Sequence, residues 1–86
     1  MTKQDYLAAA ELYLGSDRRS AALLGPRVFR SVANALRFAI EEAAPVSLRG
    51  ARLAVGRKSF SRNDMLALYH SRRYPLVRRN SVPTTR

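Results

Sequence analysis

The chain has 86 residues, of which 47% are hydrophobic and 26% charged, and it contains no cysteine. This composition is typical of one small folded domain, and it excludes disulfides and thiolate metal sites. No stretch approaches the roughly 18 apolar residues that span a membrane, and Asp5 and Glu11 interrupt the N-terminal stretch, unlike a secretory signal. We therefore expect a cytoplasmic protein with no membrane partner.

The net charge is +10, and nearly all of it lies in the second half of the chain. Residues 1–44 hold six basic and five acidic residues, whereas residues 45–86 hold ten basic residues against Asp64 alone. A GC-rich genome would explain arginine in place of lysine, but it would not explain the near absence of acids after Glu42. A concentrated positive charge attracts polyanions. Nucleic acid is the favoured partner, with a merely solvated surface and an acidic protein as alternatives.

The N-terminal segment has the pattern of a helix. Thr2 and Asp5 resemble a capping box, the alanines and leucines that follow are strong helix formers, and Gly15 would close the helix. Such a helix would be apolar almost all round, which is typical of a central core helix or of a surface for dimerisation or docking. Leu12 would lie on that docking surface.

Before the midpoint, the sequence predicts a segment that is either a short helix or a loop, and after it a clear helix. Residues 16–26 indicate either a short helix capped by Ser16 or an ordered loop that carries Leu23 and Leu24 to the core, and "RVFR" after them indicates a brief extended segment. Residues 32–44 then form an amphipathic pattern that Pro45 stops. Phe38 lies on the polar side of this helix, so it is either covered by the first helix or faces a partner.

The second half predicts a β-hairpin that leads into a last helix. Residues 51–55 alternate in hydropathy, Gly56-Arg57 suits a two-residue type II′ turn, and residues 58–60 return the chain. Ser61 and Asp64 form a second capping box, and the helix that follows ends at Tyr74-Pro75.

These elements predict a small, mainly helical α+β domain. Its order is helix, short helix or loop, helix, β-hairpin, helix. The single domain covers residues 1–77, and residues 78–86 are a flexible basic tail because they are polar, basic and proline-containing.

One weak resemblance accompanies this reading. The stretch "ALRFAIEE" at 35–42, with "LY" at 68–69 and "YPL" at 74–76, resembles short uncharacterised bacterial proteins. The resemblance implies no activity and no site residues.

The inventory of reactive side chains argues against an enzyme. His70 is the only histidine, cysteine is missing, and the four glycines are scattered instead of forming a phosphate-binding loop. We expect no catalytic residues, no metal site and no cofactor, and a surface position for His70.

The remaining candidate site is a basic surface around the hairpin and the last helix. Few exposed aromatic residues accompany it, so duplex DNA is slightly preferred over a single strand or RNA. We expect a non-catalytic nucleic-acid-binding protein, for example a small DNA-binding regulator. The competing function is an adaptor or inhibitor that forms a homodimer, or docks on an acidic protein, through Leu12 and Phe38. The cations expected to contact phosphates are Arg57, Lys58, Arg62, Arg72, Arg73, Arg49 and Arg52.

Overall fold

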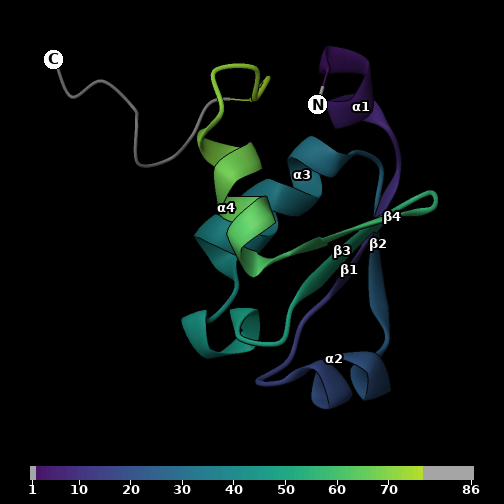
Figure 1. Cartoon of the computed structure of the whole chain (residues 1–86), viewed down its shortest axis with the longest axis vertical. Coiled ribbons are helices and arrows are strands. Elements are labelled where there is room, and N and C mark those ends of the chain that lie inside the picture. The colour runs from purple at the N-terminus through teal and green to yellow at the C-terminus, as the bar shows by residue number, and fades with distance from the viewer. Residues whose placement is uncertain (1, 77–86) are drawn as a thin grey trace, which may run out of the picture.

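The computed structural model describes residues 2–76, which form a four-stranded antiparallel sheet with helices packed on one face and a further helix, residues 18–24, at one end of the sheet (Figure 1). The strands lie in the order β2-β1-β3-β4, and the predicted α+β class is confirmed. The predicted tail at 78–86 lies outside the described residues. The strands are β1 (Ala10–Tyr13), β2 (Pro26–Phe29), β3 (Arg52–Val55) and β4 (Lys58–Ser61). The helices are α1 (Lys3–Leu7), α2 (Arg18–Leu24), α3 (Val32–Arg37), the π-helical η1 (Phe38–Glu42), the 3₁₀ helix η2 (Pro45–Leu48) and α4 (Arg62–His70).

The two faces of the sheet have different environments. Successive side chains on a strand point to opposite faces, and directly paired residues share a face. Leu12 on β1 pairs with Leu53 on β3, and both are fully buried beneath the helices. The opposite face, which we call the open face, is exposed at most of its positions. It consists of Glu11, Tyr13, Val28, Arg52, Ala54, Ser59 and Ser61.

The prediction of a helix from Thr2 to Gly15 is wrong beyond Leu7. The capping box does form, with the Thr2 hydroxyl accepting from the Asp5 N–H at 3.2 Å. After Leu7, however, the chain becomes β1, the strand that pairs with both β2 and β3. Pairing on both sides satisfies the backbone of this segment, and that tertiary gain overrides its helix propensity. Leu12 is therefore a core residue instead of a docking residue.

Residues 18–24 form a helix, α2, and not the ordered loop that the sequence left open as an alternative. Its N-cap is Asp17 and not Ser16, because the Asp17 carboxylate accepts the Ser20 N–H at 2.7 Å. Leu23 and Leu24 do not enter the core, since they are 79% and 76% exposed. The extended segment predicted at "RVFR" is confirmed as β2.

The predicted helix over 32–44 is confirmed as α3 and η1, but it ends at Glu42. The last turn widens, since the Ala43 N–H donates to the Phe38 carbonyl five residues earlier at 2.9 Å. Phe38 is half-buried. Its cover comes from β2 and not from the first helix: the Phe29 ring lies 5.5 Å away and the Arg27 guanidinium 4.5 Å away.

The hairpin prediction is confirmed. Gly56 has a φ of 59°, and Arg57 does not share a positive φ, as a type II′ turn requires. The capping box of Ser61 and Asp64 opens α4 as predicted. The helix ends at His70, earlier than predicted, because Ser71 adopts an extended conformation. The chain then turns inward to Tyr74.

Three tyrosines join the helical layer. Tyr6 on α1 donates to the Leu68 carbonyl at 2.7 Å, and Tyr74 donates to the Ala33 carbonyl at 3.0 Å. Tyr69 donates to the Glu41 carboxylate. Each hydroxyl has a partner in a different element, so the buried rings also fix the relative positions of α1, α3 and α4. No helix among residues 2–76 is long and apolar enough to cross a bilayer.

Two glycines hold the end of the sheet where α2 begins, at a contact that we call the glycine junction. The Gly50 N–H donates to the Gly15 carbonyl at 2.9 Å, and the Gly15 N–H donates to the Ser47 carbonyl at 2.9 Å. A Cβ on Gly50 would lie 1.9 Å from the Asp17 carbonyl carbon, and one on Gly15 would lie 2.4 Å from the Ala21 nitrogen. The junction therefore tolerates no side chain at either position.

We predict that Gly50→Ala destabilises the fold strongly. The added Cβ would meet backbone that cannot move independently, so the cost should be about 3 kcal/mol, the upper end for overpacking. The melting temperature should then fall by roughly 10–20 °C, measured by thermal unfolding followed by circular dichroism. Gly56→Asn is the matched control, because no atom lies within 4 Å of its Cβ position. Asparagine tolerates positive φ, so its cost should not exceed about 1 kcal/mol. Equal losses in both variants would contradict the tight packing at Gly50.

Candidate nucleic-acid interface

The seven cations predicted to contact phosphates do not form one surface. Arg57 and Lys58 lie at the hairpin turn, whereas Arg62 follows the other end of β4, roughly 13 Å away at the usual rise of a strand. Arg72 and Arg73 follow the C-terminal end of α4, not its last turn as predicted. The structure therefore divides the predicted site into three parts.

One hairpin cation already lies close to an acid. The pKa of Asp5 is lowered chiefly by the hydrogen bonds from Thr2, and the positive charge of Lys58 lowers it further. Asp5 and Lys58 line the same small hollow beside Phe60 and Leu68. The hairpin turn therefore offers less uncompensated positive charge than the sequence indicates.

The remaining predicted cations gather at the glycine junction. Arg49 and Arg62 line a hollow of about 270 Å³ together with Arg18 from the start of α2. We call this site the basic hollow. The remainder of its lining is small or polar and consists of Gly50, Ala51, Ser61 and Asn63.

Arg18 is a site residue that the sequence analysis missed. It belongs to the half of the chain in which acids and bases nearly balance, and it lies 31 positions before Arg49. The close contacts of Gly50 with Asp17 and of Gly15 with Ala21 bring α2 to the hollow. No local pattern in the sequence signals a contact between segments so far apart.

A second hollow adjoins the basic hollow. It has a volume of about 210 Å³, shares Arg18 and Gly50 with the basic hollow, and adds Tyr13 and Arg52 from the open face. We call it the tyrosine pocket. The Arg52 guanidinium lies 4.4 Å from the centroid of the Tyr13 ring, a cation–π contact. Two small side chains, Ala21 and Ala22, complete its lining.

The charge around the basic hollow is net positive, because its three arginines outnumber the two nearby carboxylates. Arg18, Arg49 and Arg62 are exposed, and within residues 2–76 none of them has a salt-bridge partner. The two nearby carboxylates are engaged as helix caps: Asp17 accepts the Ser20 N–H, which lowers the pKa of Asp17, and Asp64 accepts the Ser61 N–H at 3.1 Å.

The start of α4 adds to the positive potential. Ser61 is the N-cap and Arg62 and Asn63 begin the first turn, so the positive end of the helix dipole lies at the hollow. A cation in the first turn is unfavourable for the helix itself. Arg62 therefore does not stabilise α4, and its charge is available to an anion.

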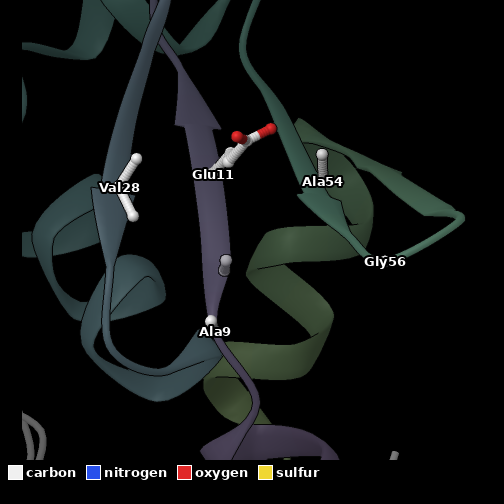
Figure 2. Close-up of a pocket in the computed structure, with 6 residues that line it drawn as sticks. Ala9, Glu11, Val28, Ala54 and Gly56 are labelled. Carbon is white, nitrogen blue, oxygen red and sulfur yellow. The ribbon is translucent and has the colours of Figure 1, made fainter.

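The middle of the open face has a different character. Glu11, Val28 and Ala54 point from three neighbouring strands to the same side (Figure 2). With Ala9, Ala10 and Gly56 they line a hollow of about 340 Å³ that contains a carboxylate and no cation. This part of the sheet repels phosphate.

No metal-binding cluster is found in residues 2–76. No three acidic or histidine side chains in that part of the chain gather into a group that could hold a metal ion. His70 is exposed, with its ring edge-on to Tyr69 at 5.1 Å.

Comparison with known proteins identifies no relative. No protein-family model matches the chain, and neither does any curated protein or solved structure. The resemblance of residues 35–42 to short bacterial proteins stays a prediction.

The lowered pKa values of Asp5 and Asp17 predict a loss of stability in acid. Both pKa values lie below the ordinary value of 3.8. Each carboxylate therefore stabilises the fold fully above about pH 3.8, and this contribution disappears as the pH falls through the lowered pKa. The free energy of unfolding, measured with urea, should fall more steeply between about pH 5 and about pH 2 for the wild type than for Asp17→Asn. Asp5→Asn serves as the control that retains the α2 cap. Identical pH profiles for the wild type and a variant that combines Asp5→Asn with Asp17→Asn would contradict the prediction.

Proposed function

We propose that this chain binds nucleic acid without catalysing a reaction, and that the basic hollow with the adjoining Arg52 contacts its phosphates. One observation carries the proposal: Arg18, Arg49 and Arg62 converge from three separate segments without a carboxylate partner in residues 2–76. Side chains of like charge repel one another, so the folded state retains this cluster at some cost. A polyanion relieves that repulsion.

The chemistry of the lining favours phosphate. Guanidinium groups bind phosphate oxygens in pairs with defined geometry, and they stay charged at every relevant pH. The side-chain amide of Asn63 adds a hydrogen-bond donor, and the first turn of α4 adds its dipole. These groups contact the backbone of a nucleic acid and do not by themselves distinguish one base from another. A small regulator that grips DNA is one protein of this kind.

Salt dependence of binding tests the proposal. Four phosphate contacts give a slope of log K against log salt near −3.6 for duplex DNA and near −2.8 for a single strand. Affinity should therefore fall about 150-fold or about 50-fold between 50 and 200 mM salt. Fluorescence anisotropy with labelled oligonucleotides measures both slopes. The absence of binding at about 50 mM salt would refute the proposal.

The position of the site is tested by a matched pair of variants. Arg62→Gln should reduce the magnitude of the slope by about 1, and it should leave the fold intact because Arg62 is exposed and opposes the helix dipole. Arg57→Gln, at the hairpin turn, is the control and should leave the slope unchanged. If Arg57→Gln alone reduced the slope, the hairpin would be the contact surface.

A second candidate function rests on a different observation. Leu23, Leu24 and Val28 are 79%, 76% and 74% exposed, and they lie on α2 and on β2, the edge strand next to it. Exposed apolar side chains close to an unpaired strand edge are typical of protein interfaces. A homodimer or an adaptor would use these residues instead of Leu12 and Phe38.

For this second candidate, sedimentation should detect association of the wild type at high concentration and a monomer for Leu24→Glu. Leu7→Glu is the matched control, because Leu7 is an exposed leucine on α1, at the opposite end of the sheet from α2 (Figure 1). A monomeric wild type at every concentration would exclude self-association. Equal dissociation of both variants would place the interface elsewhere.

A further inference from the structure

The tyrosine pocket supplies a feature that phosphate binding alone does not require. It places a half-exposed aromatic ring and a flat guanidinium beside the cationic hollow, and the two hollows share Arg18 and Gly50. A nucleotide has the same two-part character, because a flat base is linked to a charged phosphate. We propose that the tyrosine pocket receives one unpaired base whose adjoining phosphate lies in the basic hollow, so that the ligand is single-stranded nucleic acid. This inference rests on the proposed phosphate contact.

The size and lining of the pocket suit a single ring system. Its volume of about 210 Å³ is below the ~300–1,000 Å³ of pockets that enclose whole drug-sized ligands. Ala21, Ala22 and Gly50 leave the space beside Tyr13 open, since none of them carries a side chain beyond Cβ. Bases stack on tyrosine rings and on arginine guanidinium planes, and this stacking is tolerant of sequence.

Tyr13 is positioned for this contact by its neighbours on the open face. Its hydroxyl lies 3.5 Å from the Glu11 carboxylate, and the Arg52 guanidinium lies over its ring. The other three tyrosines are buried in the helical layer. Tyr13 is thus the one tyrosine of the four that is partly exposed, and a base in the pocket would either displace Arg52 from this ring or stack on its guanidinium.

The distribution of charge on the sheet also favours binding of a nucleic-acid strand at the end of the sheet, and not at its centre. Glu11 lies in the middle of the open face, where it repels phosphates, and the cations lie at the end of the sheet near the glycine junction. A strand would therefore follow the arginines and turn one base inward. In a duplex, that base would first have to leave its pair and its stack, which costs a few kcal/mol. The preference for duplex DNA expected from the sequence is thereby reversed.

The experiment compares an intact short oligonucleotide with one of equal length whose nucleotides are abasic. Both present the same phosphates. We expect the wild type to bind the intact strand about tenfold more tightly, the effect of one stacked base. Tyr13→Ala should lose that tenfold advantage and keep its affinity for the abasic strand, whereas Tyr13→Phe should retain the advantage.

Two further variants make the result independent of the stability of Tyr13→Ala. Ala22→Leu fills the pocket from an exposed position on α2 without changing charge, and it should also remove the tenfold advantage. The chain has no tryptophan, so Tyr13→Trp introduces a unique fluorophore that should be quenched by the intact strand and not by the abasic one.

The outcomes separate the two proposals. Equal affinity for intact and abasic strands would overturn the base pocket and leave the phosphate contact standing. The failure of both strands to bind at about 50 mM salt would overturn both. A tenfold advantage for either a ribo- or a deoxyribo-oligonucleotide supports the inference, and comparison of the two identifies the preferred sugar.

Discussion

The close contact of backbones at the glycine junction is the constraint on which the proposed site depends. Gly15 ends the β1 segment, Gly50 precedes β3, and each lies against α2 backbone with no room for a Cβ. Two hydrogen bonds of 2.9 Å link these segments. Because backbone meets backbone here, the position of α2 relative to the sheet is fixed directly instead of through adjustable side chains.

That constraint explains how a small domain keeps several arginines together. Burial of the hydrophobic core under α3 and α4 stabilises the fold. This stabilisation offsets the repulsion among the arginines that the glycine junction holds close together. Anything that binds only this folded arrangement adds its binding energy to the stability of the domain. Stability and the proposed phosphate contact are thus coupled through the same few backbone atoms.

The accuracy of the sequence-based predictions depended on how local the relevant interactions are. The hairpin, both capping boxes and the helix beginning after Ser31 are determined by neighbouring residues, and all of them are present. Residues 10–13 were misassigned because alanine and leucine favour a helix, and only pairing with β2 and β3 reveals their alternation. The same distinction applies to the site. Arg49, Arg52 and Arg62 were anticipated from local charge, whereas Arg18 depends on a contact between Asp17 and Gly50.

The strand order has a consequence for how the chain is made. β1 is the first of these four strands along the chain, yet it lies between β2 and β3 in the sheet, so Leu12 pairs with a residue 41 positions later. Until Leu53 has been translated, β1 can pair only with β2, so its helix-forming sequence competes with one strand pairing instead of two. Because N-terminal segments emerge first during synthesis, the nascent segment should be helical and convert to a strand when the second half arrives. The core of the domain is therefore complete only after β3 and α4 have been translated.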